Sequence, residues 1–370
     1  MIRLAVPSID EADLAAVRRV LETGYLVQGP HVAEFERRVA AEVGTAHAVA
    51  VANGTAALHL ALLALGVGAG DRVAVATYSW PATANVIALC GAEPVFVEVE
   101  PCTGNMDPAR LAEALARGPV KAVLPVHAFG GAADMPRIVE VARSAGAAVV
   151  EDAACALGTE VGGRRAGAWG ELGCFSFHPR KAITTGEGGM VTTDDAALAR
   201  TLRMLRNHGQ DPDAGAPDFV VPGYNLRMTE FQAALGSAQM AKLDRLVESR
   251  RAQAARYDRL LAGSPVTPPG SLPGSRHVYQ SYAALLPAAA APRRAAIIAG
   301  LKEQGIETTL GTYHMPLITY FRTRYGFAPG DFPVTDDVAA RAISLPLYEA
   351  LAPADQERVV DALVRACARA

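Results

Sequence analysis

Short apolar runs rich in β-branched residues alternate with helix-like stretches over roughly the first 200 residues of the chain. Helix-like stretches at 107–117 and 135–145 separate some of these runs. This alternation is typical of a layered α/β domain, and strands that are apolar throughout indicate a parallel sheet covered on both faces. The sequence therefore predicts a three-layer α/β domain with a mostly parallel sheet. The runs expected to be strands are 72–77, 94–100, 121–127, 147–153, 174–178 and 189–194.

The last third of the chain follows a different pattern. A long helical stretch is expected over 229–262, and a loop rich in Pro and Gly follows at 265–275. The remainder reads as a smaller α+β unit. We therefore predict a large α/β domain at 1–240 and a small C-terminal α+β domain at 241–370. The small domain is expected to hold strands near 279–287 and 306–310 and helices near 292–304 and from 353 onward.

Composition excludes several classes of protein. The net charge is −3, from 35 basic and 38 acidic residues, so nothing points to a polybasic nucleic-acid binder. No signal peptide is expected, and the uncharged run 46–70 reads as strand, turn and helix rather than a membrane helix. Five cysteines without a CxxC pair fit a reduced cytoplasm and no zinc site. We expect a cytoplasmic protein with no nucleic-acid partner, no membrane contact and no metal.

Three places along the chain are candidates for chemistry. Lys181 lies in FSFHPRKAITTGEGG, a glycine-rich turn between two strands. A lone lysine in such a turn is usually a solvent-exposed charge. A functional role is favoured here by Asp152, which lies at the carboxyl end of the strand AAVVEDA. Parallel sheets bind ligands beyond the carboxyl ends of their strands. That aspartate could cap a helix or pair with the protonated ring nitrogen of pyridoxal phosphate (PLP). Asn53-Gly54-Thr55 lies at the start of an expected helix. The free backbone amides there could bind a phosphate, or Thr55 could simply cap the helix.

These motifs together resemble a known family. NGTAALHLAL, VVEDAA, FSFHPRKAITTGEGG, GYNLRMTEFQAALGSAQ and DFPVTDDVAARAISLPLYEAL occur in the order found in the DegT/StrS family of sugar aminotransferases. The resemblance runs from about Gly24 to the C-terminus. It implies a fold-type-I enzyme that uses PLP.

The resemblance assigns roles to residues around the cofactor. Lys181 corresponds to the lysine that forms a Schiff base with PLP, and Asp152 to the partner of its pyridine nitrogen. Gly54, Thr55 and Ser176 match positions that bind the phosphate.

Further residues match by the same resemblance. Trp80 stands where the family places an aromatic ring stacked on the cofactor, although a half-buried core tryptophan is the alternative. His178 matches a histidine on the substrate side, or serves as a structural loop residue. Asn225 matches a residue that reaches the phosphate from the neighbouring subunit, which implies a homodimer with shared active sites.

One position departs from the family pattern. The family often has Gln or His three residues after the aspartate, close to the phenolic oxygen of the cofactor, and here Cys155 is found. A thiol is a weaker hydrogen-bonding group than an amide. We expect the cofactor to bind still, with altered proton affinity at its link to the lysine.

The C-terminal unit holds a stretch rich in aromatic residues, from Tyr313 to Phe332. The resemblance places Tyr313 and His314 near the substrate entrance, where aromatics could stack on a nucleotide base. A packed loop is an equal alternative. Arg227 and Arg322 could meet a diphosphate, although exposed arginines are common.

The resemblance also implies the reaction. L-glutamate would donate its amino group, and a keto sugar would accept it in a ping-pong sequence. Lys181 disfavours the sugar dehydratases of the family, which carry His at this position, and ITTGEGG resembles members that aminate nucleotide-linked 4-keto sugars. A keto cyclitol or another natural-product ketone remains an alternative acceptor. A non-catalytic regulatory member of the family is the alternative of another class.

Overall fold

A seven-stranded sheet forms the centre of the computed structural model, which describes residues 1–368. β10 runs antiparallel to both of its neighbours, and every other neighbouring pair is parallel. The expectation of a mostly parallel sheet is therefore confirmed. In spatial order the strands are β1 (His47–Val51), β10 (Gly189–Thr193), β9 (Leu172–Ser176), β6 (Ala148–Asp152), β5 (Ala122–Leu124), β2 (Arg72–Ala76) and β4 (Glu93–Val97).

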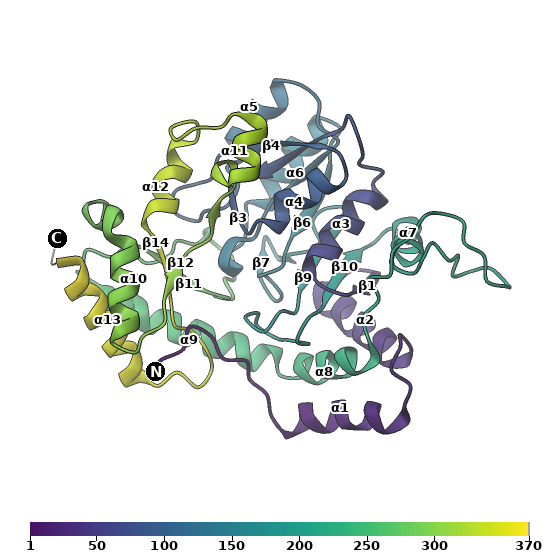
Figure 1. The fold of residues 1–370 in the computed structure, drawn as a ribbon, viewed down its shortest axis with the longest axis horizontal. Coiled ribbons are helices and arrows are strands. Elements are labelled where there is room, and N and C mark those ends of the chain that lie inside the picture. Colours follow the sequence, from purple (N-terminus) through teal and green to yellow (C-terminus); the bar gives the residue numbers. More distant parts are fainter. Residues whose placement is uncertain (369–370) are drawn as a thin grey trace.

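Helices cover both faces of this sheet, which gives the three layers (Figure 1). One face packs against α3 (Gly54–Ala64), α4 (Ala82–Leu89) and α7 (Ala196–Arg206). The other face packs against α2 (Pro30–Val43), α5 (Pro108–Ala116), α6 (Met135–Ser144) and α8 (Glu230–Met240). Because helices cover both faces, a strand such as β10 is buried along its whole length.

The long helix expected at 229–262 is two helices. The chain leaves the helical path at Lys242, where φ is −117°, so α8 ends and α9 (Leu243–Leu261) begins in a new direction. The Lys242 ammonium is held 2.8 Å from Asp10 and 2.5 Å from Asp13. These carboxylates belong to the first helix, α1 (Glu11–Thr23), and to its N-cap. The ion pairs fix the bend and dock α1 against α8.

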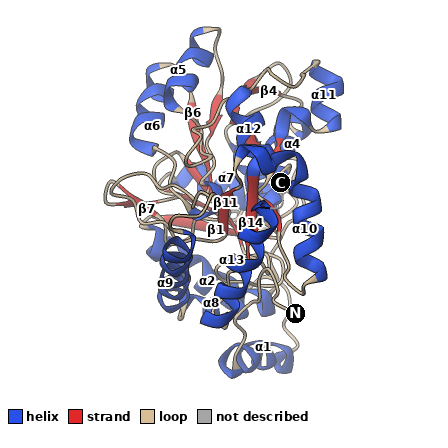
Figure 2. Ribbon diagram, turned by 90° about the vertical axis from the view of Figure 1, so that its left-hand side faces the viewer, coloured by secondary structure: helices blue, strands red, loops and turns tan. Residues whose placement is uncertain are grey.

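The smaller sheet is antiparallel and consists of β11 (Tyr282–Leu285), β14 (Ala342–Leu345) and β12 (Thr309–Leu310). α10 (Arg294–Glu303), preceded by the 3-10 turn η2 (Ala288–Arg293), and α13 (Pro353–Ala368) flank this sheet (Figure 2). The N-terminus joins the same unit, because Ile2 is buried and bridges Ile306. The division at residue 240 stays a prediction, and this N-terminal segment crosses it.

Part of the C-terminal chain returns to the large sheet. α11 (Thr319–Tyr325) and α12 (Pro333–Arg341) bring three aromatic rings onto Phe96 of β4. Ring centroids lie 5.5 Å away for Phe321, 5.4 Å for Phe327 and 6.4 Å for Phe332. These members of the aromatic stretch are packing residues.

Short strands and turns complete the fold. β3 (Tyr78–Ser79) pairs with β13 (Tyr313–His314), which leads into the 3-10 turn η3 (Met315–Leu317). β7 (Glu160–Val161) and β8 (Arg164–Arg165) form a hairpin, and η1 (Ala128–Gly130) is a 3-10 turn after β5. Among residues 1–368, no helix combines the length and apolar character that crossing a membrane requires.

The segment between α7 and α8 projects away from the body of the molecule (Figure 1). Phe219, Val220 and Tyr224 of this segment are exposed. We call residues 207–229 the arm.

Candidate active site

Three strand ends meet at one edge of the large sheet. β6 ends at Asp152, β9 ends at Ser176, and β1 ends just before Asn53-Gly54. These strands run in the same direction, and the parallel register places Asp152 opposite Cys174. Their carboxyl ends therefore converge at the edge where α/β sheets bind ligands.

Lys181 lies in the loop that turns back from β9 to the antiparallel β10. The backbone amide of Lys181 donates to the His178 carbonyl at 2.8 Å, and the Arg180 amide donates to His178 Nδ1 at 3.2 Å. Buried Ile183 anchors the loop. The Lys181 ammonium donates to Cys155 Sγ at 3.1 Å. The structure thus brings Lys181, His178 and Cys155 together.

Asp152 is almost completely buried beside this loop, with 5% of its surface exposed. Its Oδ2 accepts from the Thr83 hydroxyl at 2.7 Å, and its Oδ1 accepts from the Ala154 amide at 3.2 Å. Burial raises the pKa of Asp152, while these hydrogen bonds and the charge of Lys181 oppose the rise. A buried carboxylate is stabilised when a cation pairs with it, and a protonated ring nitrogen supplies such a cation.

A cradle suited to a phosphate lies where α3 begins. A Cβ on Gly54 would lie 2.8 Å from Ser176 Cβ, so only glycine allows this close approach. Asn53 Oδ1 accepts from the Ala56 amide at 2.8 Å and is the N-cap, so the alternative of a cap by Thr55 is wrong. The amides of Gly54 and Thr55 have no acceptor among residues 1–368, so the helix N-terminus can bind an anion.

These features fit PLP at both of its ends. The amides of the α3 N-terminus and the Ser176 hydroxyl suit its phosphate, and the buried Asp152 carboxylate suits its ring nitrogen. Lys181 supplies an amine from the same edge of the sheet. The residues present therefore match the group that the resemblance implies.

Two aromatic residues stand together beside this edge. Trp80 is 61% exposed, and its ring meets the edge of Tyr313 with centroids 5.4 Å apart. The pairing of β3 with β13 sets Tyr313 opposite Ser79, next to Trp80. The exposed pair can receive a flat ligand group from solvent.

The two histidines differ in their surroundings. His178 is half-buried, and burial lowers its pKa. The His314 side chain is only 9% exposed and lies 3.1 Å from Asp336, and burial lowers its pKa as well. His314 thus lies against α12, while His178 shapes the lysine loop.

Asn225 and Arg227 lie on the arm. Arg227 donates to the Asn207 side chain at 2.5 Å, and Asn225 is exposed and bridges Asn207 through its backbone. Neither side chain hydrogen-bonds to Lys181, Asp152 or Ser176 in the part of the chain that the structure describes. Within one subunit they are separate from the group around the lysine.

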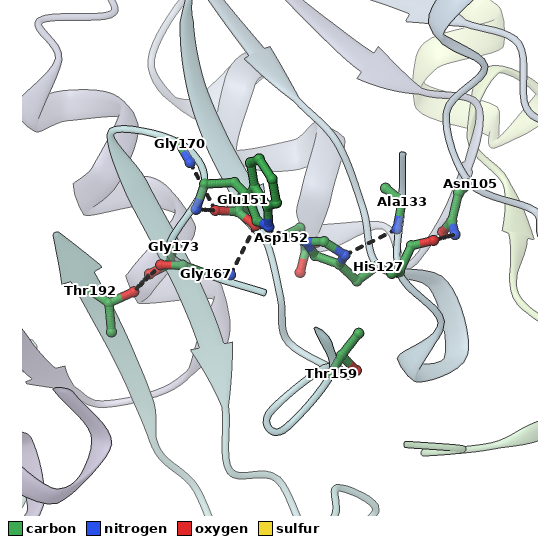
Figure 3. A network of polar contacts seen from close by, with 12 residues as sticks. Asn105, His127, Ala133, Glu151, Asp152, Thr159, Gly167, Gly170, Gly173 and Thr192 are labelled. Carbon is green, nitrogen blue, oxygen red and sulfur yellow. Dashed lines mark hydrogen bonds and ion pairs between the residues drawn. The ribbon is translucent and has the colours of Figure 1, made fainter. Parts of the chain in front are cut away.

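Glu151, the residue before Asp152 in β6, is a second buried carboxylate (Figure 3). Glu151 accepts from the amides of Gly167, Trp169 and Gly170 at 2.6–2.9 Å. It also lies 2.9 Å from His127 Nε2, while the Ala133 amide donates to His127 Nδ1. Because Nδ1 accepts, the neutral ring carries its proton on Nε2 and donates it to Glu151. These four donors hold the strand that ends in Asp152.

The motifs do not predict Thr83 or Ser79. Thr83 lies in the first turn of α4, and its hydroxyl is 2.8 Å from that of Ser79. Both residues are buried. The only sequence signal is a polar residue at a helix start directly after a strand end.

A comparison with known families decides the assignment. The model of the DegT/DnrJ/EryC1/StrS aminotransferase family matches residues 7–364. The chain belongs to this family. The aminotransferase and PLP expectations are therefore confirmed, because DegT/DnrJ/EryC1/StrS aminotransferases depend on PLP.

Individual relatives cover nearly the whole chain. GDP-perosamine synthase of Caulobacter vibrioides is 38% identical over 365 residues, covering 98% of this chain and 97% of that protein. A pleiotropic regulatory protein of Geobacillus stearothermophilus is 38% identical over 347 residues, covering 92% and 91%. The PLP form of Spr1654 from Streptococcus pneumoniae, described as a sugar aminotransferase, superimposes with a TM-score of 0.93 at 28% identity and covers 100% and 99%. This DegT/DnrJ/EryC1/StrS member thus shares its whole fold with that solved structure.

Proposed function

We propose that this chain transfers the amino group of L-glutamate to the keto carbon of a nucleotide-linked 4-keto-6-deoxyhexose by a ping-pong mechanism. The observation that carries the proposal is the convergence of Lys181, Asp152 and Ser176 at one edge of the sheet. The similarity to GDP-perosamine synthase supports a sugar nucleotide as acceptor. The turn ITTGEGG supports amination at C4 rather than C3.

Binding of the cofactor is divided between two sets of residues. Gly54, Thr55 and Ser176 hold the phosphate through backbone amides and a hydroxyl. Asp152 holds the opposite end, because its buried carboxylate gains a cationic partner there. When bound, PLP supplies the electron sink for the carbanion that transamination requires.

Lys181 moves protons once its amine is free. A neutral amine near the reacting carbon can act as general base and then as general acid. Cys155 Sγ, 3.1 Å from the Lys181 nitrogen, accepts a hydrogen bond and orients it. His178 shapes the turn that carries the lysine, and Trp80 and Tyr313 line the entrance.

An absorbance spectrum of the purified protein, before and after addition of L-glutamate, tests this proposal. We expect a visible band from the cofactor linked to Lys181 and its conversion by glutamate to the aminated form. A Lys181→Ala variant should lose both the band and turnover. A visible band that does not change when glutamate is added would overturn the assignment of glutamate as amino donor. Full turnover by Lys181→Ala would overturn the proposed role of the lysine.

A second acceptor class is a keto cyclitol or another natural-product ketone, because related glycine-rich turns occur in cyclitol aminotransferases. A panel of nucleotide-linked 4-keto sugars and keto-inositols distinguishes the two. The relative described as a pleiotropic regulatory protein favours one further alternative, a regulatory role without turnover. The intact set of Lys181, Asp152 and Ser176 argues against it.

We further propose a homodimer in which Asn225 completes the phosphate site of the partner. The exposed position of Asn225 and the exposed apolar side chains of the arm support this, as do exposed Tyr25 and Val27. Mixing Lys181→Ala with Asn225→Ala subunits should restore activity, because one of the two sites in a mixed dimer is then intact. Two inactive variants that stay inactive when mixed would overturn the shared site.

A further inference from the structure

Within residues 1–368, one side-chain hydrogen bond joins the smaller unit to the loop that carries Lys181. Gln280 Nε2 donates to the carbonyl of Arg180 at 2.8 Å. Gln280 lies just before β11, so this contact joins the entrance of the smaller sheet to the peptide preceding Lys181. No motif identified in the sequence includes this residue.

The orientation of the Gln280 amide is determined by a neighbour. The Ser281 hydroxyl donates to Gln280 Oε1 at 3.0 Å. Because the oxygen is taken by a donor, the amide nitrogen is the end that faces the Arg180 carbonyl. The hydrogen bond to the lysine loop therefore has a defined direction.

The residue before Gln280 has an unusual backbone. Tyr279 has φ +48°, in the left-handed region that bulky residues rarely adopt. Its ring stacks on His277 at 3.9 Å with an interplanar angle of 12°, and its amide donates to His277 Nδ1 at 2.8 Å. Strain of this kind persists only where surrounding contacts impose it, and it gathers at functional sites.

A buried arginine imposes this turn. Arg250 of α9 is 6% exposed and donates to the Gln280 carbonyl at 3.0 Å and to the Tyr279 carbonyl at 3.4 Å. Burial lowers the pKa of Arg250 to about 10, so the group stays charged at neutral pH. On the other side, the Ser281 amide donates to the Phe129 carbonyl at 3.3 Å. The turn is thus fixed from two elements.

We propose that Gln280 is a positioning residue for Lys181. The strained turn at Tyr279, held by Arg250, directs the Gln280 amide at the Arg180 carbonyl and fixes the peptide from which the lysine projects. This inference rests on the proposed role of Lys181 as the cofactor-binding lysine. It makes the smaller unit part of the machinery that aligns the lysine with the cofactor.

Hydrogen–deuterium exchange of the apoprotein tests the positioning directly. Gln280→Met and the isosteric Gln280→Glu both remove the side-chain N–H that donates to the Arg180 carbonyl, the carboxylate because it is ionised at neutral pH. We expect amides over 178–184 to exchange about two- to tenfold faster in both, the range that one hydrogen bond contributes. Gln304→Met is the matched control, because Gln304 Nε2 donates to the Gly300 carbonyl at 3.0 Å, away from the lysine loop. It should leave 178–184 unchanged.

The loaded enzyme gives a second readout. For both Gln280 variants we expect kcat to fall about tenfold from misplacement of the amine, with KM for each substrate within about twofold. The apparent pKa of the visible band should shift in both variants and not in Gln304→Met. A merely structural role would lower the melting temperature without moving this pKa.

Two results would overturn the inference. One is exchange over 178–184 in both Gln280 variants that equals that of the wild type. The other is an effect in Gln280→Met that Gln280→Glu lacks, which would assign the effect to shape rather than to the donated hydrogen. A wild-type protein without a visible band would instead refute the proposed function, and the exchange data would still decide whether Gln280 holds the loop.

Discussion

The Thr83 hydroxyl donates a hydrogen bond to Asp152 Oδ2 across 2.7 Å. A hydroxyl has one proton, so the 2.8 Å contact between Ser79 and Thr83 must have Ser79 as donor. A chain of hydrogen bonds therefore runs from β3 through α4 to the end of β6. It stabilises the charged form of Asp152, whose pKa burial raises.

Removing this hydroxyl should weaken the hold on the cofactor. We expect Thr83→Val to lower kcat about tenfold or more, because a hydrogen bond to a charged group contributes roughly 1.5–3 kcal/mol. Thr83→Ser keeps the donor and should stay within about threefold of wild type on the same basis. Steady-state kinetics and titration of the apoprotein with PLP measure both effects. Wild-type values for Thr83→Val would show that Asp152 needs no partner from α4.

Cys155 offers a second test, at the lysine itself. Cys155→Gln replaces a weak sulfur acceptor with an amide that both accepts and donates. Because Sγ contacts the Lys181 nitrogen at 3.1 Å, the substitution should change the apparent pKa of the visible band. Absorbance titration from acid to alkaline pH measures it. Identical titration curves for the variant and the wild type would contradict this prediction.

Glu151 should matter for stability more than for chemistry. Glu151→Gln puts an NH₂ group among four donors, so at least one buried donor loses its acceptor. We expect the free energy of unfolding to fall by about 2–4 kcal/mol. Urea denaturation of the apoprotein measures it without cofactor linkage. Glu113→Gln, at an exposed ion pair, is the control and should change stability by about 0–1 kcal/mol.

His277 predicts a dependence of stability on pH. Burial lowers its pKa to about 3, whereas an unfolded histidine titrates near about 6.5. Below that value the unfolded chain binds a proton that the folded chain does not. This contribution to stability is therefore complete above about pH 6.5 and is lost as the pH falls, by up to about 1.4 kcal/mol per pH unit.

The matched variant is His277→Asn, whose side-chain oxygen can still accept from the Tyr279 amide. Its unfolding free energy should fall less steeply between about pH 6.5 and about pH 4, because the unfolded wild-type histidine is protonated in this range and the folded one is not. Denaturation midpoints collected across this range measure the slope. Parallel curves for variant and wild type would assign the acid sensitivity to other groups.

The sequence predicts much of the large sheet, because its strands are largely apolar and several of them stand between clear helices. The observed bounds of β2, β6 and β10 differ from those expected by one residue at one or both ends. The break at Lys242 escapes prediction, because the hydrophobic spacing of α8 and α9 is continuous. Its cause is a contact with Asp10 and Asp13, more than 200 residues away in sequence.

The same limit applies to the site. Lys181, Asp152 and Ser176 are predictable because each lies in a motif at a strand end. Thr83 and Gln280 contact the candidate site from distant segments, which spacing along the chain does not reveal. Asn53 rather than Thr55 caps α3, because the helix begins two residues earlier than a cap at Thr55 would require.

The reversed direction of β10 determines where the Lys181 amine can be. A parallel neighbour would require a crossover helix that carries the chain to the opposite edge of the sheet. β10 instead pairs antiparallel with β9, so the connection stays at the carboxyl edge and holds Lys181 there. A shift of one residue in this pairing would move the lysine relative to Asp152 and turn alternate side chains to the other face. Insertions or deletions between Ser176 and Gly189 should therefore be tolerated far less than those in the arm.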